Sequence, residues 1–182
     1  MKVFIVIVIA LAVGIALLVY HLHGNDALGT ARERAEFEFV AHGSYAQVFP
    51  LFGAEKERVW AGKEWAPTFV YPKPANDVQG AVFTVRHGHA TDVPWVNTAF
   101  DQQSGHVQYV YVIPNTLTTL IDIHIASQDA QNTRVDVMYE RTALRAGADE
   151  RVRRMAEHDR KSGPEWSEQI NKYLATVSSS KQ

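Results

Sequence analysis

The fold is decided by residues 106–140, which read HVQYVYVIPNTLTTLIDIHIASQDAQNTRVDVMYE. Apolar and polar residues alternate along segments 106–113, 119–125 and 135–140, and turn residues separate these segments. A period of two is typical of a strand with one buried face and one wet face. Because short turns join the segments, we expect neighbouring strands to be antiparallel. The stretch therefore predicts three consecutive strands of one antiparallel sheet.

The alternation also predicts which side chains of these strands point toward a core. Tyr109 and Tyr111 share a face with aliphatic residues, and so does Tyr139. His124 has the opposite parity to the isoleucines around it, so it is expected to face water. A tyrosine inside an apolar enclosure supplies a hydroxyl group without a charge, although an ordinary core tyrosine fits the same pattern.

The rest of the chain adds strands before this stretch. Alternation and turn residues predict strands over residues 32–41, 68–71, 80–87 and 95–100. A short helical stretch over residues 45–52 separates the first of these strands from the second. Along the chain we therefore expect one strand, then a helical segment, then a run of five or six strands.

The pattern at the end of the chain predicts one long amphipathic helix over about residues 149–177. Ser162-Gly163-Pro164 is a candidate interruption, because proline suits either a restart or a kink of a helix. Its apolar stripe consists of Trp166, Ile170, Tyr173, Leu174 and Val177. Asp159, Glu165 and Glu168 are expected on its solvated face. One helix covers such a sheet only if the sheet wraps around it, and this arrangement tends to leave a cavity. We expect an α+β domain over residues 32–177.

Residues 3–20 form an uncharged apolar run that is long enough to cross a bilayer core as a slightly short helix. A cleaved signal peptide and an uncleaved anchor both fit residues 1–24, and the lack of a clean A-x-A cleavage site favours the anchor. Lys2 favours a cytoplasmic amino terminus, which would place the domain on the extracytoplasmic side of the membrane. Residues 25–31 are expected to be a tether, and residues 178–182 a disordered tail.

Composition excludes several classes of function. The net charge of −2 gives no electrostatic footprint for nucleic acid. Cysteine is absent, so disulfides, thiolate catalysis and thiolate metal sites are excluded. The sequence also holds no glycine-rich phosphate loop, no G-x-S-x-G and no H-E-x-x-H motif. We therefore assign no catalytic residue and no cofactor.

Taken as an ordered set, these elements resemble the START-related SRPBCC superfamily, which includes polyketide cyclases and lipid-transfer proteins. The resemblance covers roughly residues 33–176 and is carried by Phe49–Trp60, Trp65, Phe69–Pro72, Gly80–Thr84, Tyr109–Pro114, Asn132–Glu140, Trp166 and Tyr173–Leu174. It implies a helix-grip fold, in which a curved antiparallel sheet wraps around a long C-terminal helix and encloses a deep cavity for a hydrophobic ligand. Many members bind ligands without catalysis, and the family has no universal catalytic motif. Gly163-Pro164 and the N-terminal apolar run depart from its usual pattern.

Eight residues are candidates for the lining of this cavity. They are Trp60, Trp65, Phe83, His87, Trp95, Tyr109, Tyr111 and Tyr139. The tyrosines suit the orientation of a ligand carbonyl, and His87 is the best candidate for an acid or base because it shares an inward face with Phe83. For the tryptophans, packing at the seam between helix and sheet is the competing explanation.

The histidines also raise the question of a metal. His87-Gly88-His89 places two imidazoles on one face of an extended segment, but a metal would need His124 or His106 to converge from other strands. We expect two histidines at a strand end and no metal site.

The sequence thus predicts a membrane-tethered domain that binds a hydrophobic small molecule or lipid, with residues 3–20 in the membrane and no nucleic-acid partner. Two alternatives stay open. One is a cyclase- or dehydratase-like enzyme that uses His87 as base and a tyrosine as acid. The other is a non-catalytic accessory protein whose surface docks a membrane partner, which a collapsed cavity and a large exposed apolar patch would favour.

Overall fold

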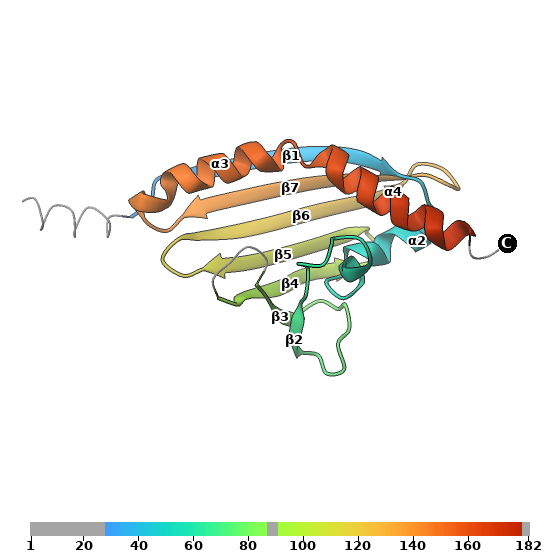
Figure 1. Cartoon of the computed structure of the whole chain (residues 1–182), viewed down its shortest axis with the longest axis horizontal. Helices are drawn as coiled ribbons and strands as arrows, with labels where there is room; N and C mark the ends of the chain where they lie inside the picture. Colours follow the sequence, from blue (N-terminus) through green and yellow to red (C-terminus); the bar gives the residue numbers. More distant parts are fainter. Residues whose placement is uncertain (1–27, 87–90, 180–182) are drawn as a thin grey trace, which may run out of the picture.

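The computed structural model of the chain describes residues 28–86 and 91–179 and contains one seven-stranded sheet. All neighbouring strands are antiparallel, in the order β1-β7-β6-β5-β4-β3-β2 (Figure 1). The strands are β1 (Arg32–Ala41), β2 (Thr68–Tyr71), β3 (Val82–Val85), β4 (Val93–Asp101), β5 (His106–Ile113), β6 (Leu117–Ser127) and β7 (Thr133–Ala143). The predicted order of one strand, a helical segment and a run of strands is confirmed, with six strands in the run.

Two groups of helices accompany the sheet. Between β1 and β2 lie the short helix α2 (Tyr45–Val48) and the 3-10 turns η1 (Phe49–Phe52) and η2 (Lys56–Val59). After β7 come the 3-10 turn η3 (Ala146–Ala148) and the helices α3 (Asp149–Asp159) and α4 (Gly163–Ser179). Both α3 and α4 pack against β1, and α3 also contacts β7.

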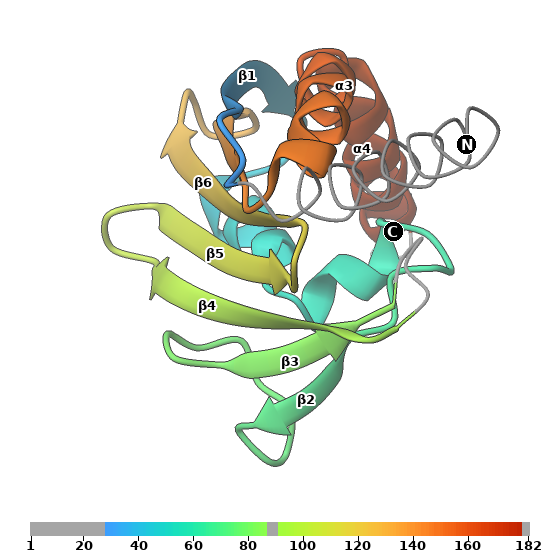
Figure 2. The same cartoon turned by 90° about the vertical axis from the view of Figure 1, so that its left-hand side faces the viewer.

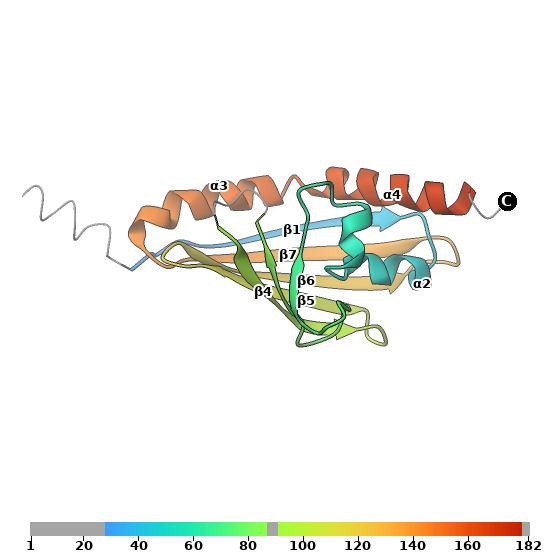
Figure 3. The same cartoon turned by 60° about the horizontal axis from the view of Figure 1, so that its bottom comes forward.

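The sheet is curved, and the helices lie on its concave face (Figure 2). Its strands twist away from the helices toward β2, as Figure 3 shows from below. The pairing of β4 with β5 shifts register between Asn97 and Ala99, and such irregularities increase the bend of a sheet. A curved antiparallel sheet with helices on its inner face is the predicted helix-grip arrangement.

The predicted inward faces are confirmed by the burial of alternate residues. On β5, Val107, Tyr109 and Tyr111 are buried, and on β7 so are Val135 and Val137. The register joins these faces, because Tyr109 lies opposite Ile121 and Tyr111 opposite Thr119. His124 is exposed on the outer face, as its parity predicts.

The single long helix predicted at the end of the chain is two helices. Helix α3 ends at Asp159, and α4 begins at Gly163, directly before Pro164. Proline has no N–H to donate and its ring collides with the preceding turn, so a continuous helix cannot pass this point. In the link, the backbone N–H of Ser162 donates to the carbonyl of Asp159 at 3.0 Å. The break falls at Ser162-Gly163-Pro164, where proline was expected to restart or kink the helix.

The end of the expected tether is fastened to the domain. The backbone N–H groups of Thr30 and Ala31 both donate to Oδ1 of Asp149 at 3.0 Å, and the Thr30 hydroxyl donates to its Oδ2 at 2.8 Å. The apolar run of residues 3–20 and residues 180–182 of the predicted tail lie outside the described residues, whereas Ser178 and Ser179 of that tail belong to α4. Within residues 28–86 and 91–179, no helix is long and apolar enough to cross a membrane.

Candidate functional site

A cavity of about 420 Å³ lies between the inner face of the sheet and the helices that cover it. Five strands, both C-terminal helices and the segment from η2 to Trp65 contribute to its wall. The lining residues are Glu57, Trp60, Ala61, Trp65, Val85, Trp95, Tyr109, Tyr111, Ile121, Ile123, Tyr139, Arg141, Met155, His158, Asp159, Ser162, Glu165, Trp166 and Gln169. A volume of this size, walled mainly by aromatic and aliphatic groups, is typical of a small-molecule site.

All four tryptophans of the chain line this cavity. Two of them are fixed through their indole N–H groups: Trp60 donates to the carbonyl of Leu51 at 2.7 Å, and Trp65 to that of Ala54 at 2.9 Å. Trp166 of α4 meets the ring of Trp60 edge-on, with 5.2 Å between ring centroids. Packing and cavity lining are therefore compatible roles for these side chains.

A buried ion pair forms the polar end of the cavity. Arg141 projects from β7 and Asp159 from the last turn of α3, and their exposed fractions are 4% and 7%. The guanidinium donates to both carboxylate oxygens, from Nε at 2.6 Å and from Nη2 at 2.9 Å. Burial would lower the pKa of Arg141, but Asp159 and Tyr111 raise it above its ordinary value. Arg141 thus keeps its charge, and the carboxyl group of Asp159 lies directly against it.

Tyr111 lies between this ion pair and the aromatic wall. Its hydroxyl oxygen accepts a hydrogen bond from Nη1 of Arg141 at 2.6 Å, while the same Nη1 donates to Thr119 at 2.9 Å. The ring stacks on Trp95, with a centroid distance of 4.1 Å. Within the described residues, the hydroxyl proton of Tyr111 has no acceptor. Tyr111 is therefore a rigidly held donor at the polar end of the cavity.

The other two tyrosines have different surroundings. The hydroxyl of Tyr109 donates to the carbonyl of Phe52 at 2.6 Å, so its proton is already used. The guanidinium of Arg141 lies over the ring of Tyr139, 4.9 Å from its centroid. Burial is the largest cause that raises the pKa of each hydroxyl well above its ordinary value. Both hydroxyls therefore stay neutral, and neither is poised to act as a base.

Glu57 adds a carboxyl group to the wall of the cavity. It belongs to η2, whose first turn is held by Asp77, which accepts hydrogen bonds from the backbone N–H groups of Glu55 and Lys56. Burial and then the charge of Asp77 raise the pKa of Glu57 well above its ordinary value. The side chain therefore keeps its proton at pH values where most glutamates have lost it.

Six of the eight candidate residues lie together on the cavity wall, and the role of each in binding stays a prediction. They are Trp60, Trp65, Trp95, Tyr109, Tyr111 and Tyr139. Phe83 is fully buried in the layer beneath, where it packs against Trp65, Trp95 and Tyr109 instead of lining the space. His87 and His89 lie outside the described residues.

The charged part of the site was not predicted from the sequence. The expectation that Asp159 belongs to a solvated face is wrong, because this carboxylate is buried against Arg141. Val152, Ala156 and Asp159 follow one another at helical spacing and are all buried, so Asp159 continues the inner face of α3. Arg141 has the same parity as the inward residues Val137 and Tyr139, and this parity was the signal that could have located it.

No family model and no curated protein matches this sequence. Solved structures do match it in shape. Norcoclaurine synthase from Thalictrum flavum, in complex with dopamine and hydroxybenzaldehyde, superposes with a TM-score of 0.58 at 9% identity, over 81% of this chain and 89% of that chain. The crystal structure of Ara h 8.0201 gives 0.54 at 14% identity, over 80% of this chain and 99% of that chain.

A solution structure of a Thermobifida fusca protein gives a TM-score of 0.57 at 13% identity and covers 77% of this chain and 92% of that chain. The identities are low, so these likenesses concern the fold. The chain shares the fold of these structures, and its curved antiparallel sheet with C-terminal helices is the architecture that the sequence predicts.

Proposed function

We propose that this protein binds a hydrophobic small molecule whose polar end carries a hydrogen-bond acceptor. The observation that carries the proposal is the unused hydroxyl proton of Tyr111, whose oxygen accepts a hydrogen bond from Arg141 at the polar end of a cavity of about 420 Å³. Burial of apolar ligand surface against the tryptophans would supply most of the affinity, at about 25 cal/mol per Å². The hydroxyl of Tyr111 would then orient the ligand.

The electrostatics of the cavity favour a neutral or weakly polar acceptor. Arg141 is already paired with Asp159 at 2.6 Å, so it offers little net charge to attract an anion. The indole N–H of Trp95 is buried and has no hydrogen-bond partner among the described residues. It is a second donor close to Tyr111, since the two rings stack. A ligand carbonyl or hydroxyl oxygen matches two neutral donors of this kind.

The proposal includes a membrane tether formed by residues 3–20, with the domain on the extracytoplasmic side. The support is the uncharged apolar run in the sequence and the position of Lys2 before it. A tether would keep the binding cavity near a bilayer, where hydrophobic ligands are concentrated. Protease protection of the domain in intact cells tests the side, and carbonate extraction of membranes tests the anchor.

The experiment that tests the binding proposal compares two probes in two proteins. Fluorescence of the cavity tryptophans would be titrated with 2-naphthol and with naphthalene, which lacks the hydroxyl group. In Tyr111→Phe, we expect the affinity for 2-naphthol to fall about fivefold, which corresponds to about 1 kcal/mol for one neutral hydrogen bond. The affinity for naphthalene should stay within twofold. An equal change for both probes, including no change for either, would remove Tyr111 from the site. A wild-type protein that binds neither probe would contradict the binding proposal.

We infer a second candidate function from Glu57, namely acid–base catalysis on the same bound molecule. A buried carboxyl group whose pKa lies well above its ordinary value is a suitable general acid. Glu57 and Tyr111 line the same cavity, so both could contact one ligand. Binding and catalysis differ in whether the ligand leaves unchanged. A product that forms with the wild-type protein but not with Glu57→Gln would favour the enzyme, and unchanged ligand in both would favour the binder.

A further inference from the structure

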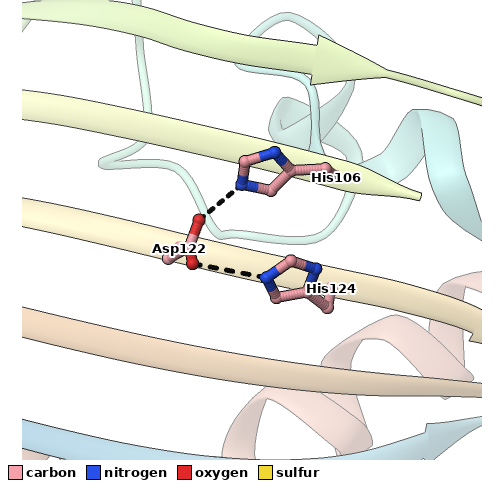
Figure 4. A group of neighbouring side chains, drawn as sticks. All are labelled: His106, Asp122 and His124. Atoms are coloured by element: carbon pink, nitrogen blue, oxygen red, sulfur yellow. Dashed lines mark hydrogen bonds and ion pairs between the residues drawn. The ribbon is translucent and has the colours of Figure 1, made fainter. Parts of the chain in front are cut away.

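The outer face of the sheet, opposite the face that lines the cavity, carries a cluster of three side chains with metal-binding groups. His106 stands on β5, and Asp122 and His124 stand on β6 (Figure 4). His106 lies directly opposite His124 in the register of the two strands, and Asp122 is two residues before His124 on the same face. Two adjacent antiparallel strands therefore hold all three groups.

We propose that His106, Asp122 and His124 form a binding site for a divalent transition-metal ion of the Zn²⁺ class. One ligand atom from each residue lies within 4.8 Å of the other two. Nε2 of His106 is 2.6 Å from Oδ1 of Asp122, and Nε2 of His124 is 3.3 Å from its Oδ2. Tetrahedral zinc with bonds of about 2.1 Å keeps its ligand atoms roughly 3.4 Å apart.

Rotation of the side chains would bring the cluster toward that geometry. The imidazole rings of His106 and His124 are parallel, with 4.8 Å between centroids. A small tilt of each ring would bring the two Nε2 atoms to the spacing that one ion requires. Two imidazoles and one carboxylate are ligands that zinc, cobalt and nickel accept.

The carboxylate of the cluster is held in place by residues behind it. Nε2 of Gln108 donates to Oδ1 of Asp122 at 3.0 Å, and the hydroxyl of Thr98 donates to Oε1 of Gln108 at 2.8 Å. This chain of hydrogen bonds crosses from β4 through β5 to β6. Groups that orient a ligand in this way are a regular feature of metal sites, and their loss weakens metal binding.

The surroundings of the cluster favour a cation and leave room for solvent ligands. The exposed fractions of the side chains are 30% for His106, 19% for Asp122 and 60% for His124, so water can complete the coordination. Beside Asp122 and His124 lies a surface groove. Its lining includes Glu36, Glu38 and Asp136, of which Glu36 pairs with Arg34 and Asp136 with Arg134. Together with Asp122, the carboxylates still outnumber these two arginines, so the remaining negative charge would raise the local concentration of metal ions.

The competing explanation is a hydrogen-bonded pair of histidines that only stabilises the two strands. The two explanations differ in the response to Zn²⁺. The test is isothermal titration calorimetry of the full chain, purified without a histidine tag, with ZnCl₂ as the probe. We expect one Zn²⁺ per chain in the wild type, an affinity at least tenfold lower in His124→Gln, and no measurable binding in the double variant His106→Ala/His124→Ala.

Two control variants separate this site from other histidines of the chain. His87→Ala/His89→Ala removes the pair that the sequence alone singled out, and His42→Ala removes an exposed histidine at the end of β1. Both should bind Zn²⁺ as the wild type does. Gln108→Ala keeps all three ligands and should weaken binding about tenfold. Circular dichroism without metal would establish that each variant is folded, and His124→Gln alters the most exposed of the three ligands.

The absorption spectrum of bound Co²⁺ gives a second readout, which a pair of histidines with only a structural role would not produce. Bound by nitrogen and oxygen ligands at the cluster, Co²⁺ should show visible absorption bands in the wild type that disappear in His124→Gln. The proposal would be overturned by a wild-type chain that binds no Zn²⁺, or by a double variant that binds it with unchanged affinity. Loss of binding in His87→Ala/His89→Ala alone would equally overturn it, because the site would then lie there.

Discussion

Arg141 on β7 and Asp159 on α3 are joined by two parallel hydrogen bonds, at 2.6 and 2.9 Å, where the sheet meets the end of the helix. Both side chains are almost fully removed from solvent. The pair joins the sheet to α3 just before the chain turns into α4, and it fixes the hydroxyl of Tyr111. It therefore connects the stability of the fold to the polar end of the cavity.

We expect Asp159→Ala to lower the free energy of unfolding by about 3–5 kcal/mol, because it leaves the buried guanidinium without a counter-charge. Urea denaturation would measure the change. The matched control is Glu157→Ala on the same helix, where the side chain is exposed and a change within about 0.5 kcal/mol is expected. The double variant Arg141→Met/Asp159→Leu should cost less than Asp159→Ala alone, and the reverse order would contradict this account.

The strands and their faces could be predicted because the alternation of buried and less buried residues is preserved along β5, β6 and β7. His106–Ile113 is a strand with the predicted bounds, and Arg32–Ala41 is another. The polar end of the cavity could not be found in this way. Its ion pair joins residues on different elements, and an arginine or an aspartate in a pattern of alternation is normally assigned to the wet face. Only the parity of Arg141 and the helical spacing of Asp159 carried a signal.

The cluster on the outer face shows a different limit of the sequence. Parity correctly placed His124 toward water, but it did not reveal that His106 would be its direct partner across the strands. That partnership depends on register, which is set by the turn between β5 and β6. A shift of one residue in the register of β5 against β6 would separate His106 from His124, and the three side chains would no longer lie together.

Glu57 should make the stability of the domain depend on pH. Burial raises its pKa in the folded protein above the ordinary value of 4.5. At pH values between 4.5 and this raised pKa, the folded protein binds a proton that the unfolded chain has released. The free energy of unfolding therefore falls as the pH rises through this window, by at most about 1.4 kcal/mol per pH unit. Glu57→Gln keeps the shape and cannot ionise, so its stability should fall less over the same range.

Denaturation of wild type and Glu57→Gln at several pH values from 4.5 upward would measure this difference. Glu168→Gln, at an exposed position of α4, is the control and should keep the slope of the wild type. If the curves for wild type and Glu57→Gln ran parallel, the carboxyl group of Glu57 would be ionised in the fold like any other.

Gly105 should be far less tolerant of a side chain than Gly62, although both have a positive φ, of 72° and 87°. A Cβ at Gly105 would lie 2.0 Å from the carbonyl oxygen of Ile125, whereas at Gly62 it meets nothing within 4 Å. Gly62→Ala should cost only the strain of a left-handed backbone, about 1–2 kcal/mol. Gly105→Ala should lower the melting temperature clearly more, because the turn between β4 and β5 must move; equal losses would contradict this description of the turn.

The central claim is that the cavity holds a hydrophobic small molecule. The most direct measurement is native mass spectrometry of the full chain, purified from cells in a mild detergent of known mass, followed by organic extraction of whatever is bound. We predict one discrete lipophilic molecule per chain, distinct from the detergent and depleted in Tyr111→Phe. A chain that is folded and free of ligand, and whose tryptophan fluorescence does not respond to a panel of hydrophobic compounds, would contradict the claim.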